Sequence, residues 1–392
     1  MKLQGRIKPG MRIAVGVGSR GITHLAEMVA ATLEILRAAG ARPFIFPAMG
    51  SHGGATPEGQ RELLASYGVT EEAMGSPIRD SLEVRQMGVT ADGVPAWCSV
   101  EALDADGIIL INRIKPHTDF GGKFGSGIIK MGVIGLGKRS GASAMHGYAA
   151  RFGYEHAILA IADILMNQAP ILGGVAILEN QHHETAAIRV LPKEDIMTGE
   201  QELFQEAARL LPRLPFDEMD LLIVDHIGKN ISGSGMDPNV TGRWVQGYSS
   251  ALRREGRPSP FIRRIFVRDL TPESHGNAIG IGLADYTTAR LVQAMDRAVT
   301  YTNALTALSV QSAKIPIHFE SDREAIEQAV ASLALPEGTA PRIVRIADTL
   351  SVANLEVSEA LWPIVRQNGL LRADGEAHDL AFDDRGNLQS TV

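Results

Sequence analysis

The segment GIILINRIKPHTDFGGKFGSGIIKMGVIGLGKRSGASAMH, which spans Gly107–His146, decides how the fold is interpreted. Its first six residues, Gly107–Asn112, are almost wholly apolar and predict a short buried strand. The histidines and lysines that follow would then lie at the carboxyl edge of a sheet, which is where α/β proteins bind their ligands. The segment therefore predicts an α/β fold with a ligand site at this edge.

Glycine and basic residues dominate the rest of the segment. Eight glycines lie between His117 and His146, and Lys130 comes thirteen positions after the first histidine and sixteen before the second. Glycine permits close approach to a bound group, and exposed amides beside basic side chains suit a phosphate or another anion. No Walker pattern occurs, which disfavours a nucleoside triphosphate. An ordinary glycine-rich connection with solvated lysines is the alternative.

Length and composition limit the class of protein. The chain has 392 residues, of which 45% are hydrophobic, so it is long enough for two domains. Its formal net charge of -7 disfavours nucleic acid or an anionic membrane as the main partner and favours a small molecule. Cys98 is the single cysteine, which excludes an internal disulfide. No signal-like or long apolar run occurs, so we expect a cytoplasmic protein.

The N-terminal region reads as a strand, a turn and a helix. Arg12–Gly16 is apolar enough for a strand, and apolar residues recur at helical spacing between Leu25 and Leu36. Arg20 falls in the turn, where its guanidinium could hold a carboxylate beside free helix amides. A surface arginine paired with a neighbouring acid is the alternative. The glycines at this turn have dinucleotide spacing, but the next strand, Arg42–Phe46, ends without the acidic residue that would hold a ribose.

A second strand-to-helix turn contains Gly50-Ser51-His52. Thr56 and Pro57 are residue types that begin a helix, so His52 is expected just before one. A histidine flanked by glycines is open to a cleft and can transfer protons near neutral pH. A histidine that only hydrogen-bonds its own loop is the alternative.

Two prolines in Pro212–Pro215 predict a domain boundary, with residues 1–214 as an N-terminal catalytic domain and residues 215–392 as a second α/β domain. Leu221–Asp225 reads as the first strand of the second domain. The polar loop Gly228–Arg243 follows it and should face the first domain across a cleft that holds the active site. Asp285–Leu308 is expected to be one long helical region.

Three motifs together resemble the LarA-like nickel-pincer lactate racemase family. They are Gly18-Ser19-Arg20, Gly50-Ser51-His52, and the series His117, Lys130 and His146. The resemblance covers the N-terminal half well and is looser beyond Pro215. The chain departs from the family's pattern at Val17, where the family has an aspartate, and at Gly242 and Val245, where it has a glutamine and a lysine.

The resemblance implies a covalent cofactor. Lys130 would carry the nickel-pincer nucleotide, a pyridinium-3-thioamide-5-thiocarboxylic acid mononucleotide, and His146 would bind its nickel. Gly127 and Gly135 would belong to the cofactor site. Separate cofactor-synthesis proteins would make and load this group.

The resemblance also implies a reaction. His52 and His117 would be the two acid/base residues, and Arg20 would hold the substrate carboxylate. Inverting a 2-hydroxy acid by hydride removal needs a base on one face of the substrate and an acid on the other, which explains two separate histidines.

The many polar residues of the second-domain loop, including Lys229 and Arg243 as substrate-binding groups, favour a 2-hydroxy acid more polar than lactate, such as a sugar acid. We therefore expect a racemase or epimerase with a small-molecule substrate. A homodimer and a monomer both remain open.

Two other functions fit parts of the pattern. In a metal-dependent hydrolase, His52, His117 and His146 would form a three-histidine zinc site, which leaves Lys130 without a role. In a non-catalytic binding protein, Arg20, Lys229 and the glycine loops would capture an anionic metabolite, which leaves the histidines without one.

Overall fold

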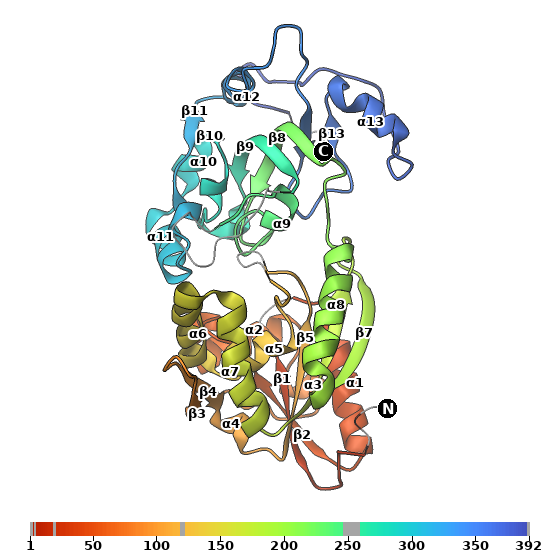
Figure 1. Ribbon diagram of the computed structural model, residues 1–392, viewed down its shortest axis with the longest axis vertical. Helices are drawn as coiled ribbons and strands as arrows, with labels where there is room; N and C mark the ends of the chain where they lie inside the picture. Colours follow the sequence, from red (N-terminus) through yellow and green to blue (C-terminus); the bar gives the residue numbers. More distant parts are fainter. Residues whose placement is uncertain (1–2, 4, 19–20, 118–121, 246–258, 390–392) are drawn as a thin grey trace. The chain divides into compact units, whose positions relative to one another are not determined.

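The computed structural model describes residues 3, 5–18, 21–117, 122–245 and 259–389. The chain divides into two compact units, Met1–Leu211 (unit 1) and Pro212–Val392 (unit 2). Each unit has its own mainly parallel sheet with helices packed on it (Figure 1), so the chain is an α/β protein. Each unit is described below by itself.

The sheet of unit 1 has the order β2-β1-β5-β6-β7 within the described residues. The first four strands in this order are parallel, and β7 is antiparallel to β6. The strands are β1 (Arg12–Val17), β2 (Arg42–Pro47), β5 (Gly107–Arg113), β6 (Ile171–Glu179) and β7 (Thr185–Pro192). The strands predicted at Arg12–Gly16, Arg42–Phe46 and Gly107–Asn112 are thus confirmed.

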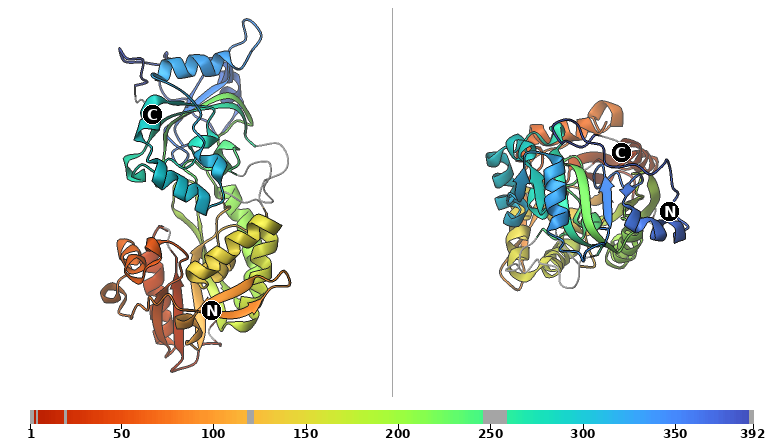
Figure 2. Two further views of the ribbon diagram at one scale, coloured as in Figure 1. Left: turned by 90° about the vertical axis from the view of Figure 1, so that its left-hand side faces the viewer. Right: turned by 90° about the horizontal axis from the view of Figure 1, so that it is seen from above.

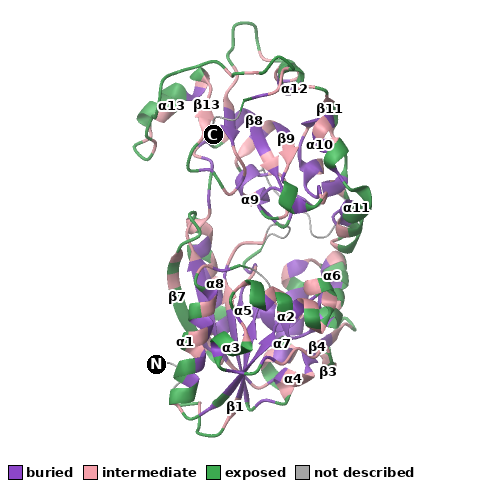
Figure 3. Ribbon diagram, turned by 180° about the vertical axis from the view of Figure 1, so that it is seen from behind, coloured by how far each residue is buried: buried purple, intermediate pink, exposed green. Residues whose placement is uncertain are grey.

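Helices flank this sheet (Figure 2), and its central strands are buried, as β1 in Figure 3 illustrates. The apolar face of α1 packs on alternate residues of β1, including Ile13 and Val15. A small hairpin, β3 (Val84–Val89) with β4 (Pro95–Ser99), stands apart from the main sheet. The helices are α1 (Leu25–Ala38), α2 (Pro57–Ser66), α3 (Glu71–Met74), α4 (Val100–Leu103), α5 (Ile128–Lys130), α6 (Lys138–Phe152), α7 (Tyr154–Gln168) and α8 (Ile196–Leu210).

Unit 2 has a second sheet, with the order β11-β10-β9-β8-β12-β13 among its described residues. Its strands are parallel except for β13. They are β8 (Glu218–Ile227), β9 (Phe261–Leu270), β10 (Tyr286–Thr288), β11 (Ile317–Phe319), β12 (Ile343–Ile346) and β13 (Glu356–Val357). The helices are α9 (Pro238–Thr241), α10 (Ala289–Ala294), α11 (Arg297–Thr306), α12 (Asp322–Ala331) and α13 (Trp362–Gln367).

One expected element of unit 2 is wrong. Asp285–Leu308 is not one helical region, because Tyr286–Thr288 forms β10 and two separate helices follow it. The hydroxyl groups of Thr287 and Thr288 donate to the backbone carbonyls of Val267 and Arg268 on β9, both at 2.8 Å. β-Branched threonines fit a pleated strand, and these bonds to a neighbouring strand override the helical spacing.

No helix in the described part of the chain is both long enough and apolar enough to cross a bilayer.

Candidate active site

Three loops of unit 1 begin side by side at the carboxyl edge of its sheet. Val17, at the end of β1, is aligned with Pro47 on β2 and with Ile111 on β5. The segments that lead to Gly18, to His52 and to His117 therefore start at neighbouring positions. Ser19 and Arg20 lie outside the described residues, so the predicted carboxylate-binding role of Arg20 stays a prediction.

His52 precedes a tight turn at the start of α2. Its side chain is exposed, and its carbonyl accepts the amide of Ala55 at 3.2 Å. Gly53 follows with a φ of 62°, and a Cβ there would lie 2.5 Å from the backbone of Gly59, so the turn requires glycine. Thr56 caps α2 as predicted, because its hydroxyl accepts the amide of Gly59 at 3.1 Å.

His117 lies in a loop that is closed by backbone pairing. Lys115 and Ser126 exchange two hydrogen bonds, at 3.0 and 2.8 Å. The half-buried ring of His117 lies against Tyr154 of α7, with the ring centroids 5.7 Å apart. Tyr154 is buried, and its hydroxyl donates to the carbonyl of Gly125 at 3.0 Å. The histidine thus rests on an anchored aromatic ring.

Lys130 ends the short helix α5 and directly precedes a π-helical turn, η2 (Met131–Gly135). Single π-helical turns are rare and occur frequently at functional sites. A Cβ on Gly135 would lie 2.7 Å from the carbonyl oxygen of Ala48, and one on Gly127 would lie 2.3 Å from a carboxyl oxygen of Glu200. The backbone contact leaves no room for a side chain at Gly135, whereas a side chain at Gly127 would displace the carboxyl group of Glu200. The role of both glycines toward a cofactor stays a prediction.

His146 lies on α6 and is electrostatically coupled to Lys130. Burial lowers the pKa of the His146 imidazole, and the positive charge of Lys130 lowers this pKa further. The two side chains, sixteen positions apart, are thus close enough for their charges to interact. A histidine whose pKa is lowered is neutral near pH 7, which is the form that binds a metal.

A buried lysine, Lys138, connects α6 to the turn that carries His52. Lys138 is 1% exposed, and its ammonium donates to the carbonyl of Pro47 at 2.6 Å and to the side-chain oxygen of Gln60 at 3.4 Å. The Gln60 amide in turn donates to the carbonyls of Gly50 and His52, at 3.3 and 3.4 Å. Burial lowers the pKa of Lys138 to about 8. Sequence reasoning missed this residue, since a lysine among glycines resembles a solvated one.

A buried carboxyl group, Glu200 of α8, lies beside the turn that contains Lys130. Glu200 is 1% exposed, and its Oε2 accepts the amide of Ile129 at 2.9 Å. Its Oε1 has no hydrogen-bond partner. Burial raises the pKa of Glu200 to about 7, although the amides of Ile129 and Ile128 act in the opposite direction. No local pattern in the sequence indicates this contact, because Ile129 lies 71 positions away.

The described residues contain no group of three or more histidine, cysteine, aspartate or glutamate side chains that could hold a metal ion. His52, His117 and His146, all of which are described, therefore do not form the three-histidine zinc site of the hydrolase alternative. The donor set near Lys130 instead offers one imidazole.

The proposed substrate-binding cations of unit 2 make contacts within their own unit. The ammonium of Lys229 donates to the carbonyl of Gly233 at 2.7 Å and to Asn303 at 3.0 Å. Arg243 forms an ion pair with Asp285 at 2.6 Å and lines a cavity of about 400 Å³. Both side chains thus have partners within unit 2, and their substrate-binding role stays a prediction.

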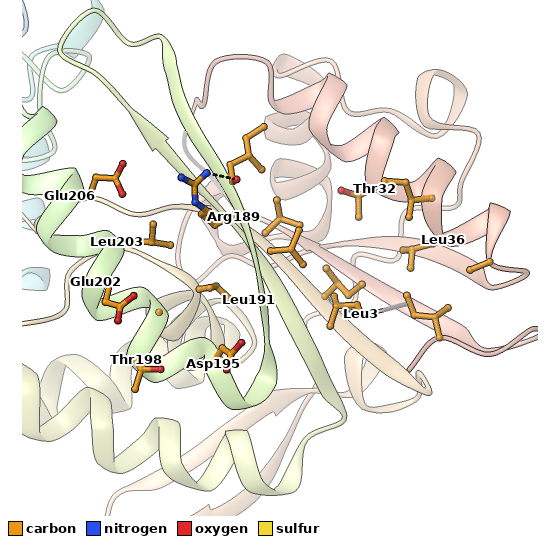
Figure 4. Close-up of a pocket in the computed structure, with 18 of the residues that line it drawn as sticks. Leu3, Thr32, Leu36, Arg189, Leu191, Asp195, Thr198, Glu202, Leu203 and Glu206 are labelled. Carbon is orange, nitrogen blue, oxygen red and sulfur yellow. Dashed lines mark hydrogen bonds between the residues drawn. The ribbon is translucent and has the colours of Figure 1, made fainter. Parts of the chain in front are cut away.

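A large cavity of unit 1 lies away from these residues. Its volume is about 970 Å³, and it is lined mainly by apolar residues of α1, β7 and α8, such as Leu36, Leu191 and Leu203 (Figure 4). None of the candidate site residues lines it. The candidate site therefore does not coincide with this cavity.

The buried carboxyl group predicts a pH-dependent stability. The pKa of Glu200 is about 7 in the folded chain against 4.5 for an ordinary glutamate. The folded state therefore binds more protons between these values, and the free energy of unfolding falls as the pH rises from 4.5 through 7. At about 1.4 kcal/mol per pKa unit, the loss is roughly 3 kcal/mol. Urea unfolding between pH 4.5 and 8 should show this slope in the wild type and not in Glu200→Gln.

Glu206→Gln, an exposed change on the same helix, is the matched control and should keep the wild-type slope. Parallel curves for the wild type and Glu200→Gln would show that the pKa of Glu200 is not raised in the folded chain.

Two comparisons found proteins that are similar to this chain. Residues 2–152 match the lactate racemase N-terminal domain. Among solved structures, the lactate racemase apoprotein from Thermoanaerobacterium thermosaccharolyticum shares 16% sequence identity, with 89% of this chain and 88% of that chain covered and a TM-score of 0.53. A protein from Thermotoga maritima shares 13% identity over 79% of this chain and 80% of that chain, with a TM-score of 0.47.

No curated protein sequence matches the chain. The matched segment contains His52, His117, Lys130 and His146, and the fold similarity to the lactate racemase apoprotein covers 89% of this chain. Residues 2–152 are thus similar to the lactate racemase N-terminal domain, and the fold of the chain is similar to that of the lactate racemase apoprotein.

Proposed function

We propose that this protein is a racemase or epimerase that inverts C2 of a 2-hydroxy acid, with a nickel-pincer nucleotide attached to Lys130. The observation that carries the proposal is the electrostatic coupling of Lys130 with His146 inside the domain that matches the lactate racemases. An amine and a neutral imidazole are the two groups needed to attach such a nucleotide and to complete its metal coordination.

The donor set fits this group better than a bare metal ion. A bare ion in a protein needs three or four ligands from the chain, and the described residues provide no such cluster. A pincer would bring three donors of its own, so the imidazole of His146 would be the one further ligand that the chain needs to supply. Hydride-transfer chemistry at C2 is what such a group would supply when bound.

The protons of the reaction are handled by the chain's own histidines. His52 and His117 follow different strands of one sheet, and the first is exposed while the second is half-buried against Tyr154. In our proposal, one imidazole accepts the proton of the substrate hydroxyl, and the other donates a proton when the opposite face is restored. Arg20 remains the proposed anchor for the substrate carboxylate.

The polar loop of unit 2 gives less support to a sugar acid than its number of polar residues suggests. The Ser232 and Ser234 hydroxyls lie 3.2 Å apart and bond each other, and the carboxylate of Asp237 accepts the amide of Asn239 at 2.9 Å. These polar groups of the unit 2 loop are satisfied without a ligand. We therefore propose 2-hydroxy acids as the substrate class and keep sugar acids as one arm of the substrate panel.

Loading of the cofactor tests the proposal directly. Co-expression with the cofactor-synthesis proteins should add the mass of the nucleotide to the wild type, and Lys130→Arg should remain unmodified because a guanidinium is a poor nucleophile. His146→Ala should keep the adduct and lose nickel. Intact mass and metal analysis give both results. Lys123→Arg, at an exposed position of the same segment, is the control that should load normally.

Racemisation by an unmodified, metal-free preparation would contradict the assignment. Nickel salts alone should not activate such a preparation.

Single substitutions of the two histidines should show which histidine acts on which face of the substrate. His52→Ala and His117→Ala should each slow interconversion in both directions by roughly 10²–10⁴ fold, because every turnover needs one base and one acid. Each variant should still form bound 2-keto acid from one enantiomer. Rapid-quench analysis with enantiopure lactate, longer 2-hydroxy acids and sugar acids would measure this.

His182→Ala, in an exposed turn after β6, serves as the control. Oxidation of both enantiomers at wild-type rates by both site variants would remove these histidines from the acid/base roles.

A further inference from the structure

Glu200 joins two parts of unit 1 that are distant in sequence. It lies on α8, 71 positions after Ile129, whose amide its Oε2 accepts at 2.9 Å. Ile129 directly precedes Lys130, so this bond holds the backbone from which the lysine side chain extends. Glu200 lies outside the 2–152 segment that matches the lactate racemase domain.

The backbone beside the Glu200 carboxyl group leaves space for it at Gly127. Gly127 has a φ of 171°, which is extended backbone that any residue can adopt, so glycine is not needed there for conformation. It is needed for space, because a Cβ would lie 2.3 and 2.9 Å from the two carboxyl oxygens of Glu200. Asn112 fixes the other side of the turn by donating to the carbonyl of Gly127 at 2.7 Å.

The carboxyl group of Glu200 is also within electrostatic range of Tyr154, the ring that packs against His117. Burial raises the pKa of Tyr154, and the negative charge of Glu200 raises it further, so the two groups lie within electrostatic range. Tyr154 packs against the ring of His117. One side chain on α8 thus adjoins both the lysine turn and the ring beneath a candidate acid/base histidine.

Packing alone gives no reason for a carboxyl group here. A buried carboxyl oxygen without a partner costs free energy, and Oε1 of Glu200 has none. An apolar side chain of similar size would fill the space without that cost. The hydrogen bonds to the start of α5 are what an apolar side chain could not provide.

We propose that Glu200 is a positioning residue for Lys130: its buried carboxyl group fixes the Gly127–Lys130 turn, and this sets the lysine amine for attachment of its cofactor. The inference rests on the proposed function for the identity of that cofactor, and it assigns no contact between Glu200 and the cofactor itself.

Amide hydrogen exchange of the unloaded protein tests the turn directly. In Glu200→Leu the amides of Ile128 and Ile129 should exchange about 10- to 100-fold faster, the range expected for loss of a hydrogen bond to a charged acceptor. Glu200→Gln retains an acceptor oxygen and should restore slow exchange. Gly127→Ala should reproduce the effect of Glu200→Leu, because its methyl group would displace the carboxyl group.

Leu203→Ala is the matched control for a general loss of stability. It removes a buried side chain from the same helix and leaves the carboxyl group in place. In Leu203→Ala the amides of Ile128 and Ile129 should therefore exchange about 10- to 100-fold more slowly than in Glu200→Leu.

Cofactor loading gives the second measurement. After co-expression with the cofactor-synthesis proteins, intact mass should show the adduct on the wild type, Glu200→Gln and Leu203→Ala, and a strongly reduced fraction on Glu200→Leu and Gly127→Ala. Unchanged α5 exchange in Glu200→Leu, or equal loading of this variant and the wild type, would overturn the proposal. If the wild type itself takes up no adduct, the proposed function fails, and the exchange measurement alone decides whether Glu200 fixes the turn.

Discussion

Parallel pairing of β1 with β2 and β5 is the constraint on which the candidate site depends. Parallel strands must each be reached by a crossover, so every strand of such a set ends at the same edge of the sheet. Val17, Pro47 and Ile111 are aligned at this edge. The turn before α2 and the loop after β5 consequently start as neighbours, although their histidines are far apart in the sequence. This register brings the loops of the candidate site together at one edge of the sheet.

Buried ionisable groups then hold the segment that contains Lys130 and His146. Lys138 binds the end of β2 and the side chain of Gln60, and Glu200 binds the start of α5. Burial lowers the pKa of the lysine to about 8 and raises that of the glutamate to about 7, so both groups are pushed toward their neutral forms. Such groups contribute little net stability. Their hydrogen bonds fix backbone positions beside the candidate site, which is where displaced pKa values are most often found.

Unit 2 shows why polar residues in a loop do not by themselves describe a substrate. Lys229 and Arg243 are both engaged within the unit, by Asn303 and by Asp285. A polar side chain that is already hydrogen-bonded in the chain must exchange that bond for one to a ligand, so its net gain on binding is small. The proposed reaction, inversion of a carbon beside a carboxylate, is thus better supported than any particular substrate.

The sequence by itself determined features that depend on local spacing: three strands of unit 1 and the cap at Thr56. The sixteen-position spacing of Lys130 and His146 was also read from the sequence alone, and their roles stay a prediction. It failed at Tyr286–Thr288, where bonds to β9 outweigh a helical pattern. Only the tertiary structure decided that Lys138 and Glu200 are buried. Their partners Gln60 and Ile129 lie 78 and 71 positions away. Desolvation of a charged group depends on which distant segments surround it, and no local pattern in the sequence encodes that.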